Sequence, residues 1–329
     1  MIRTTRRALL PVAALAALAL AACGSGDPLA EGGDAASPGG AESSAGGGDA
    51  AGGSVVVGGA NFTEMNIMEA MYAALLEDAG YEVEIVASDS REIYGDALVN
   101  GQIDVVPEYA ATMAEYLNRE VNGPDAEVVA TNDAQTTVEA MRPLAEELGL
   151  VVLEPAAASS QNGYAIQESV ATENDITTLS DYAAFQPEIV LAATEECPTR
   201  PFCEPGLEET YGFDVTEVLP LGFGSPQAKA AVVDGTADMA LVGTTDATLA
   251  ADGLVLLEDD QSLQLADNLV PVVNAESAED QTLVDTLNSL ADVLETEDLA
   301  ELNRRVDADR ELPDDVARSF LEEEGLLGG

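Results

Sequence analysis

The sequence contains no histidine and no tryptophan, and Lys229 is its only lysine. The lack of histidine excludes Ser-His-Asp triads, imidazole-ligated zinc sites and every acid–base scheme that depends on a histidine. The sequence also lacks a nucleophile elbow, a P-loop and a dinucleotide-binding fingerprint. We therefore expect a protein that is not an enzyme and that has no cofactor and no metal site.

Basic residues are scarce as well. The 12 lysines and arginines are outnumbered by 62 aspartates and glutamates, which gives a formal net charge of -50. A chain this negative is repelled by nucleic acid and by anionic membrane surfaces, so we expect neither as a partner. Because the acidic residues are spread along the chain, we interpret them as a solvated surface of the kind that salt-adapted organisms use. Steering of cationic ligands is the alternative role.

The N-terminus carries a targeting signal. Three arginines precede an apolar run, residues 8–22, that is too short and too rich in alanine for a permanent membrane span. This pattern is typical of a signal peptide over residues 1–22. The run ends in Leu-Ala-Ala-Cys23-Gly, which resembles the lipobox of bacterial lipoproteins and implies cleavage before Cys23 and lipidation of that residue. A plain signal peptide with a chance cysteine is the alternative.

A linker is expected to follow the lipidated cysteine, over residues 23–53. It is rich in glycine, alanine, serine and acidic residues, and this composition buries too little apolar surface to fold. As a flexible coil of about 30 residues it would span roughly 30 Å. We therefore expect a folded body that is tethered near the membrane without a fixed orientation.

The folded body, residues 54–327, is long enough for two domains and alternates strand and helix patterns. The expected strands are residues 55–57, 82–86, 103–106, 151–153, 163–166, 189–192, 237–242, 254–257 and 268–273. The expected helices are residues 64–78, 91–99, 136–148, 205–212 and 227–233, a helix that starts at 179, and an amphipathic helical region over 278–327. We expect Asn61 or Thr63 to cap the first helix. The alternation predicts an α/β fold with helices on both faces of a sheet.

The segment from Asn100 to Thr112 is the most informative part of the body. Its pattern predicts a helix end at Gly101 and a buried strand that Pro107 and Glu108 terminate. Tyr109 would then lie at the carboxyl edge of the sheet, where ligands bind in open α/β folds. Tyr109 and Thr112 would supply an aromatic face and a hydroxyl group to such a site.

Two cysteines remain after Cys23, in the segment Cys197-Pro-Thr-Arg-Pro-Phe-Cys203. Outside the cytoplasm, two cysteines this close in sequence most often form a disulfide. We expect the bond to hold a rigid turn and to fix Arg200 within it. A metal site made from two cysteines is the weaker alternative.

An ordered series of motifs resembles one protein family. The motifs are Asn61-Phe-Thr-Glu64, Gly101-Gln-Ile-Asp-Val-Val-Pro-Glu-Tyr109, Asn162-Gly-Tyr164, Leu179-Ser-Asp181, Pro205-Gly-Leu207 with Tyr211-Gly212, Thr244-Thr-Asp246, Leu257-Glu-Asp-Asp260 and the region from Leu302-Asn303 to Leu321. Together they resemble the substrate-binding proteins of osmoprotectant ABC importers, which bind glycine betaine, carnitine or choline. The resemblance implies a type II periplasmic-binding-protein fold, with a hinged cleft between two mixed-sheet domains. Domain 1 would comprise residues 54–160 and 269–329, and domain 2 would comprise residues 161–268.

The resemblance also implies a binding site. In this family tyrosines surround a quaternary ammonium group, and a lysine, an arginine and a threonine hold a carboxylate. Tyr109 and Tyr164 match cage tyrosines, and Thr112 and Arg200 match carboxylate-binding positions. The full set of expected ligand-binding residues is Tyr109, Thr112, Tyr164, Arg200, Asp267, Thr245, Asn61, Arg91 and Tyr94.

Three positions depart from the family pattern. Ala60 replaces the usual lysine, and Gly243 and Asp267 replace two cage tyrosines. In one interpretation Asp267 attracts a cation that has no carboxylate, such as choline. In the other, the pocket is larger and takes a bulkier solute, with Arg91 and Tyr94 lining it.

The expected function is that of a lipid-anchored receptor on the extracytoplasmic face of the cell membrane. It would deliver a quaternary amine, such as glycine betaine or choline, to an ABC permease and its ATPase. The alternatives are a binding protein for another amino-acid-like or cationic solute, and a sensory lipoprotein on the same fold. An enzyme that uses paired acids such as Asp259 and Asp260 is the remaining alternative.

Overall fold

The computed structural model describes residues 52–88 and 90–328 of the 329-residue chain. The predicted signal peptide, the predicted lipidation site Cys23 and nearly all of the predicted linker lie outside the described residues. Within the described part of the chain, no helix combines the length and the apolar character needed to cross a membrane.

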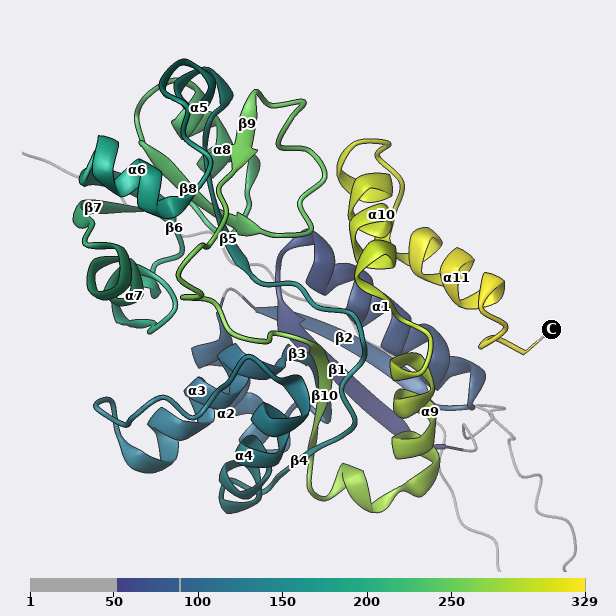
Figure 1. The fold of residues 1–329 in the computed structure, drawn as a ribbon. Coiled ribbons are helices and arrows are strands. Elements are labelled where there is room, and N and C mark those ends of the chain that lie inside the picture. The colour runs from purple at the N-terminus through teal and green to yellow at the C-terminus, as the bar shows by residue number, and fades with distance from the viewer. Residues whose placement is uncertain (1–51, 89, 329) are drawn as a thin grey trace, which may run out of the picture. The chain divides into compact units, whose positions relative to one another are not determined.

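The first of two five-stranded sheets has the strand order β2-β1-β3-β10-β4 (Figure 1). Its strands are β1 (Ser54–Ala60), β2 (Glu82–Ser88), β3 (Val105–Tyr109), β4 (Leu150–Val152) and β10 (Leu269–Asn274). β1 runs parallel to β2 and β3, whereas β10 runs antiparallel to β3 and β4. The sheet is therefore mixed, and β10, which lies between β3 and β4, comes from a distant part of the sequence.

Helices cover both faces of this sheet (Figure 1). On one face α2 (Arg91–Val99), α3 (Ala110–Asn122) and α4 (Ala134–Glu147) share a core with β3 and β10. On the other face α1 (Thr63–Asp78), α9 (Gln281–Ala291), α10 (Thr296–Asp307) and α11 (Pro313–Glu323) form a second core with β1. We call this sheet and these helices the first lobe.

The second sheet has the strand order β7-β6-β8-β5-β9. Its strands are β5 (Asn162–Gln167), β6 (Glu188–Ala193), β7 (Asp214–Pro220), β8 (Met239–Gly243) and β9 (Leu254–Leu256). Its helices are α5 (Glu168–Asn174), α6 (Leu179–Phe185), α7 (Glu204–Gly206), which continues as a π-helical turn over Leu207–Tyr211, and α8 (Pro226–Val233). β6 is parallel to β7 and β8, and β5 is antiparallel to β8 and β9. These elements form the second lobe.

The chain crosses between the two sheets twice, through residues 153–161 and residues 257–268. The two crossings lie side by side, since Ser159 and Asn268 form a β-bridge and the Ser160 N–H donates to the carbonyl of Asp267 at 3.2 Å. A pair of adjacent crossings is suited to a hinge between lobes. The predicted boundary at 160/161 lies within the first crossing and that at 268/269 lies at the end of the second, and the division into two domains stays a prediction.

Two local predictions were wrong. β3 extends through Pro107 to Tyr109, because Pro107 lies opposite Pro271 in the register with β10 and this pair needs no N–H donor. Neither Asn61 nor Thr63 caps α1; Phe62 occupies the cap position without a side-chain bond. The hydroxyl of Thr63 instead donates to Asp307 at 2.7 Å.

Candidate ligand-binding cleft

A cleft of about 510 Å³ lies between the lobes. The first lobe contributes the turn between β1 and α1, the end of β3, and parts of α2 and α3. The second lobe contributes the start of β5, the loop that contains Cys203, and the turn after β7. Asp267 reaches the cleft from a crossing segment. The cleft is therefore bounded by both lobes and by the hinge region.

Three aromatic rings meet in this cleft. The ring centroids of Phe62 and Tyr109 are 6.4 Å apart and the rings are nearly parallel. The ring of Phe223, from the second lobe, lies 5.0 Å from that of Phe62. Phe62 and Phe223 are half-buried, so part of each ring is open to the cleft. This arrangement offers aromatic faces contributed by both lobes.

Phe223 lies beside Gly243, the position at which the family resemblance implied a third tyrosine. A Cβ atom at Gly243 would be 3.6 Å from the Phe223 ring. The space next to this glycine therefore already contains an aromatic side chain from the turn after β7. An aromatic wall is retained there by a different residue, which the sequence analysis missed.

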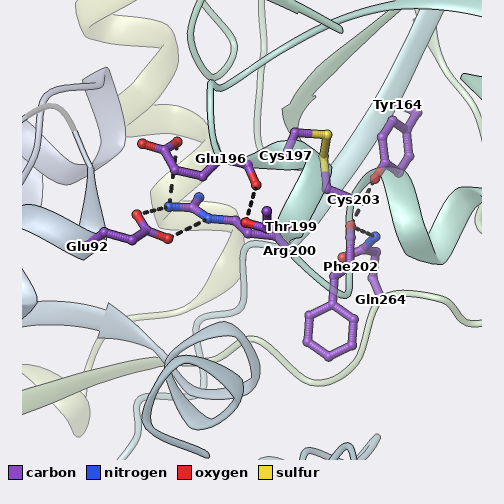
Figure 2. The surroundings of a disulfide bond; sticks show 9 residues. All are labelled: Glu92, Tyr164, Glu196, Cys197, Thr199, Arg200, Phe202, Cys203 and Gln264. Atoms are coloured by element: carbon purple, nitrogen blue, oxygen red, sulfur yellow. Dashed lines mark hydrogen bonds and ion pairs between the residues drawn. A yellow bond between two sulfur atoms is a disulfide. The ribbon is translucent and has the colours of Figure 1, made fainter. Parts of the chain in front are cut away.

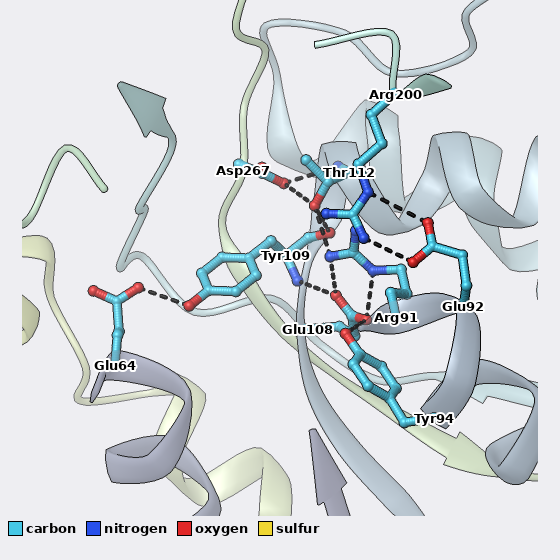
Figure 3. Close-up of polar contacts among 9 residues, drawn as sticks. All are labelled: Glu64, Arg91, Glu92, Tyr94, Glu108, Tyr109, Thr112, Arg200 and Asp267. Atoms are coloured by element: carbon cyan, nitrogen blue, oxygen red, sulfur yellow. Dashed lines mark hydrogen bonds and ion pairs between the residues drawn. The ribbon is translucent and has the colours of Figure 1, made fainter. Parts of the chain in front are cut away.

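The first lobe places a buried ion pair at one wall of the cleft (Figure 3). Nε and Nη2 of Arg91 donate to the two carboxylate oxygens of Glu108 at 2.8 and 2.7 Å. The Tyr94 hydroxyl donates to the same carboxylate at 2.5 Å, and Arg91 also donates to the Thr112 hydroxyl at 3.0 Å. Glu108 is fully buried. Arg91 and Tyr94 line the cleft as expected, but their polar groups hold Glu108.

Asp267 is buried at the base of the cleft, close to Arg91. The backbone N–H of Thr112 donates to its Oδ1 at 3.0 Å (Figure 3). Burial raises the pKa of Asp267 to about 7, although the Thr112 N–H and the charge of Arg91 act in the opposite direction. The carboxyl group therefore changes charge near neutral pH, at the edge of the aromatic faces.

The loop between Cys197 and Cys203 lines the cleft and reaches the first lobe, where Arg200 meets Glu92 (Figure 2). The predicted pair of cysteines is bonded, with an S–S distance of 2.06 Å. Arg200 in this loop forms an ion pair with Glu92 of α2 at 2.8 Å, and Arg119 of α3 donates to the carbonyl of Thr199. The loop of the second lobe therefore contacts two helices of the first.

The arginines of the cleft are engaged within the protein. Arg91 pairs with Glu108, Arg200 pairs with Glu92, and Arg119 donates to Thr199. Six acidic side chains line the cleft, namely Glu92, Glu115, Glu120, Glu195, Glu196 and Asp267, against these three arginines. The excess of carboxylates makes the cleft attractive to a cation.

Two predicted site residues do not line the cleft. Tyr164 is buried in the core of the second lobe, and its hydroxyl donates to the Phe202 carbonyl at 2.9 Å (Figure 2). β5 lies between β8 and β9, so its side chains pack on neighbouring elements of the same lobe. Thr245 is buried in a hydrogen-bond network between the lobes. Asn61, in contrast, is exposed at the cleft beside Phe62.

Comparisons with known proteins agree with this architecture. Residues 53–323 match the family described as the substrate binding domain of ABC-type glycine betaine transport systems. The chain belongs to this family. It is a substrate-binding protein of the ABC transport class, which works on the extracytoplasmic side of the membrane. Such a domain binds its solute without converting it, in agreement with the expectation that the chain is not an enzyme.

Individual relatives cover most of the chain. A glycine-betaine-binding protein of Pseudomonas aeruginosa is 28% identical, over 82% of this chain and 88% of its own length. The glycine betaine-binding protein YehZ of Escherichia coli is 27% identical, over 82% of this chain and 90% of its own. A crystal structure described as a glycine betaine/carnitine/choline ABC transporter superposes with a TM-score of 0.62 at 21% identity, covering 83% of this chain and all of that one. The predicted two-lobed fold is confirmed.

Proposed function

We propose that the cleft binds a quaternary ammonium solute and that the chain presents it to an ABC importer. The observation that supports this most strongly is the meeting of Phe62, Tyr109 and Phe223 in a cleft that the carboxyl group of Asp267 also lines. A quaternary nitrogen cannot donate a hydrogen bond, so aromatic faces and nearby negative charge are its natural partners. A desolvated cation–π contact contributes about 2 kcal/mol.

The charge pairing in the cleft favours a cation without a carboxylate group. A ligand carboxylate would have to take Arg200 from Glu92, or Arg91 from the fully buried Glu108. Breaking the second pair would leave a buried charge without its partner, which costs several kcal/mol. Glycine betaine therefore has only two side chains to use, the more exposed Arg200 and Arg119, which donates to the carbonyl of Thr199. We expect choline to bind more tightly than glycine betaine.

A thermal-shift panel tests this proposal. Choline, glycine betaine and carnitine should raise the melting temperature of the full chain, with choline giving the largest shift at equal concentration. Proline, which has no quaternary nitrogen, serves as the comparison. A panel in which no quaternary amine stabilises the protein, or in which proline is the best ligand, would refute the proposed ligand class.

Membrane attachment and delivery form the second part of the proposal. The lipobox at Cys23 supports attachment through lipid on the extracytoplasmic face. Cys23→Ala should abolish incorporation of labelled fatty acid into the protein, and metabolic labelling of cells would measure this. Incorporation equal to that of the wild type would contradict a lipid anchor at Cys23. Loss of choline uptake in cells without this protein would support delivery to an importer.

A further inference from the structure

Behind the aromatic faces of the cleft lies a buried carboxylate that the proposed binding mode does not use. Glu64 belongs to the first turn of α1 and is 5% exposed. Three donors from separate elements converge on it: the Tyr109 hydroxyl at 2.7 Å, the Thr245 hydroxyl at 2.5 Å and the Asn303 side-chain amide at 2.7 Å. Figure 3 shows the Tyr109 ring pointing its hydroxyl at Glu64.

These donors connect parts of the molecule that a hinge motion would separate. Tyr109 ends β3 of the first lobe, whereas Thr245 follows β8 of the second lobe. The Thr245 hydroxyl is also within 2.9 Å of the Ser160 hydroxyl, which belongs to a crossing segment. One carboxylate group is therefore bonded to a ring of the cleft through Oε1 and to the opposite lobe through Oε2.

We propose that Glu64 is a positioning residue that couples the cation-binding face of Tyr109 to closure of the two lobes. When the lobes are in contact, Thr245 helps to hold Glu64 in place, and Glu64 fixes the orientation of the Tyr109 ring. When the lobes separate, a buried carboxylate loses a charge-assisted hydrogen bond, and such bonds are among the strong ones. Closure and ring placement therefore favour each other.

The contact with Glu64 also affects the ring itself. A phenol that donates to a carboxylate is polarised toward its phenoxide form, which makes the aromatic face more electron-rich. Burial and the charge of Glu64 keep the pKa of Tyr109 well above its ordinary value, so the hydroxyl retains its proton and remains a donor. Glu64 thus adds negative charge behind the ring without occupying space in the cleft. This negative charge strengthens the binding of a cation to the Tyr109 ring, but it does not strengthen the binding of a neutral ligand of the same shape.

The test is a set of variants measured with choline. Glu64→Gln keeps the size of the side chain but removes its charge, and we expect it to raise the Kd for choline at least tenfold. Tyr109→Phe removes only the hydroxyl, and we expect a smaller loss. Because that hydroxyl acts through Glu64, the double variant should bind choline no more weakly than Glu64→Gln alone. Additive losses, or an unchanged Kd in Glu64→Gln, would overturn the proposal.

Thr245→Val tests the link between the lobes and serves if Glu64→Gln fails to fold. It should speed choline dissociation several-fold in stopped-flow experiments and raise amide hydrogen exchange around residues 61–66 and 243–248 together. Thr216→Val is the control at an exposed position, because it removes a hydroxyl whose bond, to the Ile189 carbonyl, stays within the second lobe. Equal behaviour of Thr245→Val and Thr216→Val would overturn the proposal.

The measurements of choline affinity and dissociation rest on the proposed function, whereas the measurement of amide hydrogen exchange in the ligand-free chain does not. If the wild-type chain binds no quaternary amine, the proposed function fails. Thr245→Val should still raise exchange on both sides of the lobe contact in the ligand-free chain. An exchange increase confined to residues 243–248 would show that Thr245 does not join the lobes through Glu64.

Discussion

The ring of Phe223 lies beside Gly243, the glycine that replaces a tyrosine of the family pattern, and this placement makes Phe223 the most direct test of the aromatic wall. Phe223→Ala removes the only one of the three clustered rings that belongs to the second lobe. The loss of one desolvated cation–π contact should cost about 2 kcal/mol. At 1.4 kcal/mol per tenfold change, the Kd for choline should rise about 30-fold. Isothermal titration calorimetry on the full chain would measure this value.

Phe223→Leu separates the aromatic effect from simple apolar contact. Leucine retains most of the apolar volume but has no π face, so most of the loss for choline should remain. The half-buried position of Phe223 limits the expected effect on the free energy of unfolding, which denaturant titration would check. Choline binding within threefold of wild type in Phe223→Ala would refute the role of this ring.

Four further predictions concern charge and covalent structure. Burial raises the pKa of Asp267 to about 7, so choline affinity should fall as the pH is lowered from 8 to 5.5 and the carboxylate becomes protonated. In calorimetry, Asp267→Asn should remove this pH dependence. The same variant should weaken choline binding more than glycine betaine binding. Between pH 4 and pH 7 the folded chain retains the proton on Asp267, whereas the unfolded chain releases it, so this group should lower the free energy of unfolding as the pH rises over that range. Asp267→Asn should reduce the dependence of the free energy of unfolding on pH, which denaturant titrations would measure. Replacing Cys197 and Cys203 together by serine should lower the free energy of unfolding by about 2 kcal/mol, as a short closed loop predicts, whereas an unchanged midpoint in denaturant would contradict this. Arg200→Gln should weaken glycine betaine more than choline in calorimetry, since only the former has a carboxylate to offer this side chain.

Much of the fold could be predicted because its strands and helices have clear hydrophobic periods. The expected helix over residues 91–99 has the observed bounds of α2. α3 was missed, because it begins directly after β3 without a loop or a side-chain cap. The N-cap position is Tyr109 itself, so no sequence signal marks the start of this helix.

The candidate site was predicted less completely than the fold. Tyr109 and Thr112 were predicted from a strand end and a family match, and Asp267 from its departure at a family position, and all three line the cleft. Phe62 lies inside the quoted Asn61-Phe-Thr-Glu64 motif, yet its proximity to Phe223 depends on how two turns of different lobes meet. Such contacts carry no local sequence pattern.

Tyr164 shows the opposite error. It matched a family tyrosine by order in the sequence, but its side chain packs into the core beneath the cleft. In a strand, neighbouring positions face opposite sides of the sheet, so order in the sequence alone does not say which side chains face the cleft. The engagement of Arg91 by Glu108 was also missed, because pairing between charged residues on different elements is set by tertiary structure.

The most direct test of the account compares choline with 3,3-dimethyl-1-butanol, its neutral carbon isostere, by calorimetry on the wild-type chain. The two molecules have nearly the same shape, so apolar contacts and hydroxyl hydrogen bonds are matched. If aromatic faces and the charge of Asp267 hold a cation, choline should bind at least tenfold more tightly. Equal affinities, or tighter binding of the neutral alcohol, would contradict the proposed quaternary ammonium site.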